Sequence, residues 1–180
     1  MGRDKAFLEI DGVPLWQRQL QVLRELKPNE IFLAGPRRAE WVGACDEIVA
    51  DVRDDAGPLA GLVAAMRRCR TPLLIALAID LPRMTADYLC QLVQACPGEI
   101  GLVPAREDRL EPLAAVYPMG SLAFAEELLF TPRPSLQEFG RRCLAQRLLQ
   151  ARPIPPHEES LFLNLNTPAD FALAASVSTR

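Results

Sequence analysis

The feature of this sequence that most constrains its fold is a near-continuous apolar run from Pro72 to Ile79, which ends at Asp80. An apolar run without polar alternation is typical of a strand that is covered on both faces in a parallel sheet. The run is far too short to span a bilayer as a helix. Leu81-Pro82 follows Asp80 and disfavours helix at that point. We therefore expect a buried strand with a carboxylate at its carboxyl end.

The rest of the chain predicts strands that alternate with helices. Pro14 opens a stretch of helical apolar spacing to Leu26, and Ser135 with Glu138 forms a capping box for a helix through Leu149. The other predicted helices begin at Gly57-Pro58, Thr85, Ser121 and Thr167, and the other predicted strands are 31–34, 47–50, 100–103, 113–117 and 161–163. Because no linker or repeat interrupts this alternation, we expect one α/β domain over residues 1–180, with a mostly parallel sheet and ligands at the carboxyl ends of its strands.

The composition excludes several classes of function. A net charge of −3 and a pI near 5.3 argue against a nucleic-acid binder, which would carry a basic stripe. The N-terminal Met1-Gly2-Arg3-Asp4-Lys5 is charged and leads into no apolar signal region, so we expect no membrane partner. The five cysteines are scattered and form no C-x-x-C pair. Free thiols in a reducing cytoplasm are therefore expected rather than a disulfide framework or a zinc site.

Two candidate sites lie where predicted strands end. Asp80 could hold Mg²⁺, a hard cation that prefers oxygen ligands and substrate phosphates, or it could merely cap a turn. Gly57-Pro58-Leu59 begins a helix, and a helix N-terminus favours negative charge. Asp51, at the end of the preceding strand, could accept hydrogen bonds from a sugar or a base. Alternatively, Gly57-Pro58 is a plain turn without a ligand. The sequence Gly57-Pro58-Leu59-Ala60-Gly61 is not a P-loop.

Three further features are ambiguous when each is taken alone. Asn164 and Asn166 share one face of a predicted strand, and Thr167 caps the helix that follows. Lys5 is a compact charge suited to phosphate oxygens, but it could also belong to a frayed terminus. His157 lies in a proline-rich polar stretch, which favours a surface loop over a catalytic site.

Five motifs follow one another along the whole chain, and together they resemble the molybdenum cofactor guanylyltransferase (MobA-like) family of nucleotidyltransferases. They are Met1-Gly2-Arg3-Asp4-Lys5-Ala6, Gly12-Val13-Pro14-Leu15, Asp51 with Gly57-Pro58-Leu59-Ala60-Gly61, Asp80-Leu81-Pro82, and Asn164-Leu165-Asn166-Thr167-Pro168. The resemblance implies a Rossmann-like, three-layer α/β/α fold. It also implies an enzyme that joins GMP from GTP to the terminal phosphate of molybdopterin and releases pyrophosphate with the help of Mg²⁺.

The resemblance also implies roles for individual residues. Lys5 and Asp80 would be catalytic, Asp80 and Asn166 would bind the metal, and Asn164 with Asn166 would line the acceptor, or pterin, side. The nucleotide-binding set would be Lys5, Asp51, Gly57, Pro58, Leu59 and Asp80. GTP and molybdopterin would be the substrates, and molybdoenzymes or other cofactor-biosynthesis proteins are candidate partners.

The chain departs from the family pattern in two places. Members of the family begin with a strand and a glycine-rich loop, and this chain starts at the methionine of that loop. We therefore expect the first strand to be absent and turnover to be poor, because the nucleotide phosphates would lose backbone donors. A start codon further upstream is the explanation that we favour over a decayed relative or a shortened chain. Ala34 stands where a nucleotide-contacting asparagine is expected, which weakens the argument for guanine.

Other functions remain open at this stage. A molybdopterin cytidylyltransferase or a sugar-phosphate nucleotidyltransferase would share the fold and differ in nucleotide or acceptor. A non-catalytic module that binds or delivers the cofactor would keep the fold without the chemistry. A dehydrogenase-like dinucleotide binder is set aside, because no G-x-G-x-x-G follows a predicted strand.

Overall fold

The computed structural model describes residues 4–53, 55–107 and 109–165. Its α-helices are α1 (Leu15–Glu25), α2 (Pro58–Arg68), α3 (Ala86–Gln94), α4 (Leu122–Leu129) and α5 (Leu136–Ala145). Its strands are β1 (Glu9–Ile10), β2 (Val13–Pro14), β3 (Phe32–Ala34), β4 (Glu47–Val49), β5 (Leu73–Leu77), β6 (Gly101–Arg106), β7 (Arg109–Leu110), β8 (Ala114–Pro118) and β9 (Leu149–Pro153). Short 3-10 helices are η1 (Lys5–Phe7), η2 (Ala39–Trp41), η3 (Met119–Ser121) and η4 (Pro156–Phe162).

The α/β class is confirmed, and the largest sheet is mixed. Its strand order is β5-β8-β6-β7, with β9 paired to β6. The apolar run of β5 pairs antiparallel with β8, from Leu73 opposite Pro118 to Leu77 opposite Ala114. β6 is antiparallel to β7 and β8, and only its pairing with β9 is parallel. A mostly parallel sheet was expected, but β6, β7 and β8 follow one another through short turns, and short turns allow only antiparallel neighbours.

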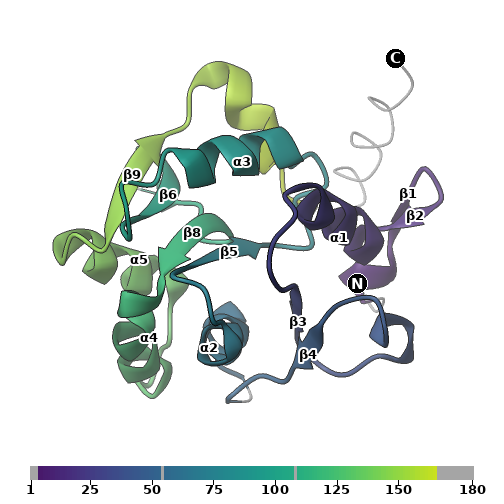
Figure 1. Cartoon of the computed structure of the whole chain (residues 1–180), viewed down its shortest axis with the longest axis horizontal. Helices are drawn as coiled ribbons and strands as arrows, with labels where there is room; N and C mark the ends of the chain where they lie inside the picture. The colour runs from purple at the N-terminus through teal and green to yellow at the C-terminus, as the bar shows by residue number, and fades with distance from the viewer. Residues whose placement is uncertain (1–3, 54, 108, 166–180) are drawn as a thin grey trace.

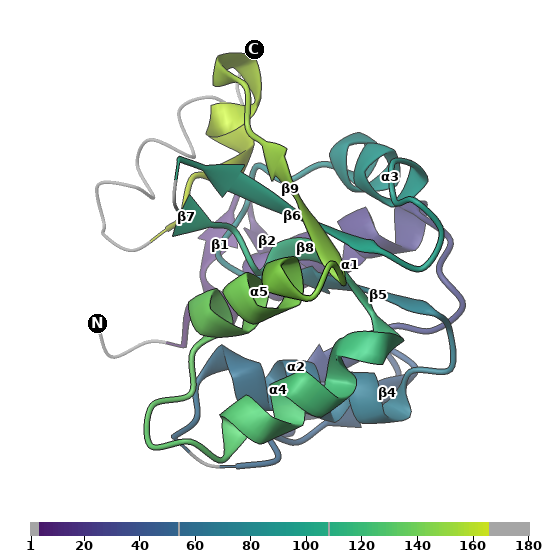
Figure 2. The same ribbon diagram turned by 90° about the vertical axis from the view of Figure 1, so that its left-hand side faces the viewer.

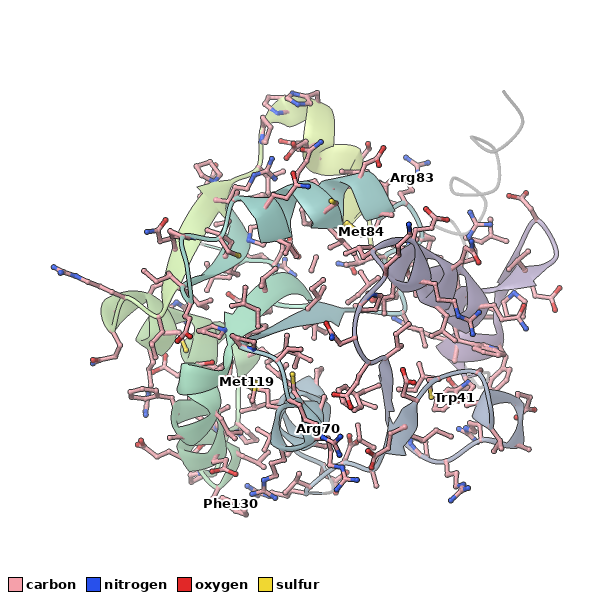
Figure 3. All side chains as sticks on the ribbon, in the orientation of Figure 1. Trp41, Arg70, Arg83, Met84, Met119 and Phe130 are labelled. Carbon is pink, nitrogen blue, oxygen red and sulfur yellow. The ribbon has the colours of Figure 1, made fainter. Side chains whose placement is uncertain are left out.

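Helices cover both faces of this sheet, as Figures 1 and 2 show. One face packs against α2, α4 and α5, where the rings of Tyr117 and Phe139 stack with centroids 5.3 Å apart. The other face packs against α3 and η4, with α1 alongside. Met84, labelled in Figure 3, is buried there with Tyr88 and Leu92. The three-layer arrangement follows from the apolar side chains that β8 buries on both of its faces.

Two small sheets complete the described fold. β3 and β4 form a parallel pair that Figure 1 shows apart from the large sheet. β1 and β2 form a hairpin whose turn holds Asp11 and Gly12 at φ values of 54° and 75°. Glycine tolerates this left-handed conformation at no steric cost. The hairpin connects the 3-10 helix η1 to α1.

A cavity of about 1010 Å³ lies between β3 and β5, and we call it the interstrand cavity. Every residue of β3 and of β5 lines it. Helix residues from α1, α2 and α3 close it, among them Leu20, Leu23, Gly61, Leu62, Ala65 and Val93. Among the described residues, β3 pairs only with β4 and β5 pairs only with β8. Each of the two strands therefore turns a second backbone edge towards this cavity.

Two sequence predictions are wrong at the carboxyl-terminal end. The helix expected through Leu149 stops at Ala145, because Arg147 takes a left-handed φ of 59° and Leu149 enters the sheet opposite Gly101. Residues 161–163, predicted as a strand, fall at the end of the 3-10 helix η4, where the Phe162 ring packs edge-on against another aromatic ring. The helix predicted from Thr167 lies outside the described residues. Over the ranges that the structure describes, no helix has the length and apolarity needed to cross a membrane.

Candidate functional site

An ion pair lies at the carboxyl end of β5. The Lys5 Nζ atom is 3.3 Å from Oδ2 of Asp80, and these side chains are 38% and 26% exposed. Lys5 is held in place because Asp4 caps the 3-10 helix η1 by accepting a hydrogen bond from the Ala6 amide. The first described residues are therefore ordered against the strand end, and the lysine ammonium stands beside a carboxylate that remains accessible to a ligand.

Asp4, the residue before Lys5, connects the 3-10 helix η1 to the loop that follows β3. The Asp4 carboxylate accepts a hydrogen bond from Arg38 Nη2 at 2.7 Å, and Arg38 follows β3 by four positions. Since Asp4 and Lys5 are adjacent in the chain, the carboxyl ends of β3 and β5 lie at one edge of the fold. Asp80 is thus placed at the edge where α/β sheets bind their ligands.

Asp51 lies at this same edge, two positions after β4, which runs parallel to β3. Its Oδ1 atom would be 3.2 Å from a Cβ atom added to Gly61, so the carboxylate packs against helix α2. Gly57 caps that helix at φ 63° and ψ −159°, a conformation that suits glycine. Gly57 and Pro58 are exposed, whereas the Leu59 side chain is buried, so Leu59 offers a ligand only its main chain.

The asparagine motif also reaches Asp80. The Leu165 amide donates a hydrogen bond to the Asp80 carbonyl at 3.1 Å. Leu165 is fully buried with Ile10 and Leu15, which fixes the segment that carries the half-buried Asn164. The structure therefore brings together Lys5, Asp80 and the Asn164 segment, three features that are far apart in the sequence. Asn166 lies outside the described residues.

The sequence of the chain matches a known family. Residues 1–151 match the model of the MobA-like NTP transferase domain. The chain belongs to this family. It is 37% identical to a probable molybdenum cofactor guanylyltransferase of Opitutus terrae, over 94% of this chain and 86% of that protein.

Two solved structures share the fold. The molybdopterin-guanine dinucleotide biosynthesis protein A of Archaeoglobus fulgidus has a TM-score of 0.76 at 22% identity, over 99% of this chain and 92% of that one. Rv0371C of Mycobacterium tuberculosis, solved in a complex with manganese, has a TM-score of 0.67 at 17% identity, over 97% and 93% of the two chains. The MobA-like resemblance noted from the sequence motifs is confirmed, and with it an enzyme of the nucleotidyltransferase class.

Two polar residues of this MobA-like domain support the site and carry no sequence signal. Gln19, 6% exposed in α1, donates a hydrogen bond from Nε2 to the Leu81 carbonyl at 2.6 Å. This bond fixes the turn that follows Asp80. Arg53 donates to the carbonyl oxygens of Leu129 and Thr131 at 2.7 and 3.0 Å, which anchors the loop after Asp51 to the end of α4. Sequence analysis could not find either residue, because each bonds a partner more than 60 positions away and no local pattern shows such a contact.

The metal-binding capacity of the site is modest. In the part of the chain that the structure describes, no group of three or more His, Cys, Asp or Glu side chains gathers in a way that could hold a metal ion. Asp80 would supply one carboxylate. This suits Mg²⁺, which is commonly bound through one or two carboxylates together with substrate phosphates and waters.

Proposed function

We propose that this chain transfers GMP from GTP to the terminal phosphate of molybdopterin. The observation that carries the proposal is the Lys5–Asp80 pair, which is held at the carboxyl end of β5 against the Asn164 segment. The pair occurs in a MobA-like domain that is 37% identical to a probable molybdenum cofactor guanylyltransferase. A cation beside an accessible carboxylate is the pairing needed where phosphates and a divalent metal meet.

The proposed reaction makes one bond and breaks one. An oxygen of the molybdopterin phosphate attacks the α-phosphorus of GTP and forms a phosphoanhydride. The bond from the α-phosphorus to the bridging oxygen breaks, and pyrophosphate leaves with the electron pair. Such a transfer needs little covalent chemistry from the protein. Positioning and charge stabilisation would therefore supply most of the acceleration.

The described residues divide these tasks between them. The Lys5 ammonium would offset charge on the triphosphate as the leaving group departs, and Asp80 would hold Mg²⁺ against the phosphates. A bound divalent metal would neutralise phosphate charge; manganese is present in the structure of the related Rv0371C. Asp51 would accept hydrogen bonds from the nucleoside, beside the exposed Gly57 and Pro58 at the N-terminus of α2. That helix end favours an anion.

The acceptor, molybdopterin, would approach Asp80 from the side of the Asn164 segment. Asn164 lies next to the residue that bonds the Asp80 carbonyl, so this segment would face the molybdopterin phosphate, together with Asn166. The substrates would be GTP and molybdopterin, and partner proteins would be molybdoenzymes or other cofactor-biosynthesis proteins. The cysteines at positions 45, 69, 90, 96 and 143 are free thiols, which suits the reducing cytoplasm as the place of the reaction.

Pyrophosphate release in the presence of Mg²⁺, molybdopterin and each nucleoside triphosphate in turn tests the proposal. We expect release with GTP preferred over the other nucleoside triphosphates. Preference for CTP would reassign the enzyme as a cytidylyltransferase. Absence of release with every nucleoside triphosphate, with molybdopterin still bound, would favour a delivery module instead.

The assay has a matched control in the chain itself. Asp80→Asn should lower pyrophosphate release by about 10²-fold or more, the size of effect that loss of a charge-stabilising group has in other enzymes. Asp87, an exposed carboxylate in the first turn of α3, has no place in the site. Asp87→Asn should leave release unchanged. Equal effects of the two variants would contradict the role given to Asp80.

A further inference from the structure

The 3-10 helix η4 is attached to β9 by an arginine–glutamate pair. Arg152, in β9, donates hydrogen bonds from its two Nη atoms to the two carboxylate oxygens of Glu158 in η4, at 2.8 Å each. The side chains are 26% and 12% exposed, so the pair is largely shielded from solvent. A two-point pairing of a guanidinium with a carboxylate fixes the orientation of the two groups as well as their separation. The pair therefore gives η4 a defined position against the sheet.

The same arginine contacts an aromatic pair that joins η4 to α3. The Arg152 Cζ atom lies 4.8 Å from the centroid of the Tyr88 ring, a distance typical of a cation–π contact. The Tyr88 ring meets the Phe162 ring edge-on, with centroids 5.4 Å apart, and both residues are buried. Figure 1 shows this segment, in yellow-green after β9, beside α3. Arg152 thus contacts the residue that pairs with it in η4 and also the tyrosine against which the end of η4 packs.

A second arginine holds η4 from β6. Arg106, the last residue of β6, donates a hydrogen bond from Nη2 to the Glu159 carbonyl at 2.9 Å, and its Cζ atom lies 5.9 Å from the centroid of the Phe162 ring. Because β6 and β9 are parallel, Arg106 and Arg152 lie at the same edge of the large sheet. β8 is antiparallel to both β5 and β6, so this is also the edge at which β5 ends before Asp80.

A very short connection links η4 to the candidate site. Leu163 and Asn164 separate the end of η4 from Leu165, whose side chain is buried and whose amide bonds the Asp80 carbonyl at 3.1 Å. Leu163 is already extended, with φ −76° and ψ 111°. An extended residue spans at most about 3.3–3.6 Å, so the connection has little slack. A shift of η4 would therefore move Asn164 or strain the hydrogen bond between Leu165 and Asp80.

We propose that Arg152 and Glu158 are positioning residues for the acceptor side of the site, and that their pair sets, through η4, the place of Asn164 relative to Asp80. The inference rests on the proposed function, in which Asn164 faces the molybdopterin phosphate. The N-terminus of α2, assigned there to the nucleotide, belongs to the helix layer on the opposite face of the large sheet from η4. Loss of the pair should therefore affect molybdopterin much more than GTP.

The alternative is that the pair only stabilises the fold. Two charges that are withdrawn from water lose hydration, and their attraction often does little more than offset that loss. A merely stabilising pair would also have no preference between the two substrates. Its removal would then weaken the use of GTP and of molybdopterin to the same extent.

Hydrogen exchange at the Leu165 amide tests the positional part of the proposal without reference to activity. In Arg152→Ala and in Glu158→Ala we expect this amide to exchange about tenfold faster or more, because η4 is no longer fixed and the segment opens locally. Amides of β4 should not change. Unchanged exchange at Leu165 in both variants would overturn the proposal.

The chain contains a matched control for these variants. Arg142, on α5 at the opposite face of the large sheet, is also paired with two carboxylate oxygens, at 3.1 and 3.2 Å. Arg142→Ala removes a comparable pair that has no connection to η4. It should leave exchange at Leu165 and the kinetics of both substrates unchanged. An effect equal to that of Arg152→Ala would mean that the loss of any such pair disturbs the segment, and would also overturn the proposal.

Steady-state pyrophosphate release tests the substrate part. A misplacement of about 1 Å can cost about 10²-fold in rate, so Arg152→Ala should lower kcat/KM for molybdopterin by about tenfold or more, with the KM for GTP within about twofold of the parent value. Arg152→Lys keeps the charge but not the two-point geometry, so its kcat/KM should fall between those of Arg152→Ala and the parent. An equal loss for both substrates, or no loss for molybdopterin, would overturn the proposal.

Failure of the proposed function would look different. The parent chain would then release no pyrophosphate from molybdopterin with any nucleoside triphosphate, and the acceptor role of Asn164 would be withdrawn. Exchange at Leu165 would still decide whether the pair of Arg152 and Glu158 fixes the segment.

Discussion

Lys5 Nζ lies 3.3 Å from Asp80 Oδ2, so a residue of the first described turn is paired with one 75 positions further along the chain. Both side chains are partly exposed, and exposed ion pairs of this kind contribute only about 0–1 kcal/mol to folding. The pair therefore has little importance for stability. Its position at the carboxyl end of β5 instead supports the phosphate-binding role proposed for Lys5.

Lys5→Met should weaken binding of GTP with Mg²⁺ by about tenfold or more, because a hydrogen bond from a charged group is worth about 1.5–3 kcal/mol. Titration calorimetry gives the Kd. Lys27, exposed and directly after the C-cap residue of α1, provides the control: Lys27→Met should leave the Kd unchanged. Both variants should unfold within about 0.5 kcal/mol of the parent chain. An unchanged Kd in Lys5→Met would remove Lys5 from the nucleotide site.

Divalent metal should bind tightly only together with nucleotide. In the proposed site Asp80 would supply one carboxylate, and the described residues hold no group of three or more His, Cys, Asp or Glu side chains that could bind a metal, so substrate phosphates would have to complete the coordination. With Mn²⁺ as the probe, electron paramagnetic resonance should show weak binding to the chain alone and much tighter binding when GTP is present. Asp80→Asn should abolish that enhancement. Tight Mn²⁺ binding without nucleotide would show that the metal site lies elsewhere.

Gly61→Ala should destabilise the fold. A Cβ atom at position 61 would lie 2.9 Å from the Cβ of Ala34 and 3.2 Å from Oδ1 of Asp51. Alanine gains about 1 kcal/mol over glycine in a helix, but overpacking costs about 1–3 kcal/mol, so we expect a net loss of about 1 kcal/mol. Urea unfolding measures it. At Gly120 the nearest atom would be 3.8 Å away, so Gly120→Ala should cause no comparable loss. Equal unfolding free energies for both variants would contradict the close approach of α2 to β3.

Local signals in the sequence predicted the helices well. Thr85 accepts a hydrogen bond from the Tyr88 amide, and Ser135 accepts one from the Glu138 amide, as their capping patterns indicated. Gly57 stands at the N-cap of α2, with proline at the first helical position. Capping depends on residues within one turn of each other, so a single sequence contains the information that is needed.

Pairing between distant strands could not be predicted in the same way. The apolar run of β5 indicated burial on both faces, but only Ala76 of its five residues is fully buried, and nothing in that run shows that its partner β8 is antiparallel. Leu149 continued a helical pattern and was assigned to a helix, yet tertiary pairing with Gly101 makes it a strand. The supporting roles of Gln19 and Arg53 depend on carbonyl oxygens that only the folded chain brings near. The family motifs indicated the residues of the candidate site, whereas the hydrogen bonds of Gln19 and Arg53 that support it could be seen only in the folded chain.

The last prediction concerns pH. Cys143 is fully buried in α5, and burial raises the pKa of its thiol to about 12. In the unfolded chain a cysteine ionises near pH 8.5, so between that pH and about 12 the unfolded state releases a proton that the folded state keeps. The neutral thiol therefore contributes stability that is fully present below pH 8.5 and is lost as pH rises, by about 1.4 kcal/mol per pH unit.

Comparison with Cys143→Ala isolates this effect from other groups that titrate at high pH. The variant should be less stable than the parent at pH 8, by about 1 kcal/mol for the small cavity. The difference should shrink and then reverse by pH 10.5, because only the parent has a buried thiol to lose. Urea unfolding at half-unit steps of pH gives both curves. Cys90 is exposed, so Cys90→Ala should run parallel to the parent throughout. A difference between the parent and Cys143→Ala that stays constant with pH would mean that the Cys143 thiol ionises as readily in the folded chain as in the unfolded one.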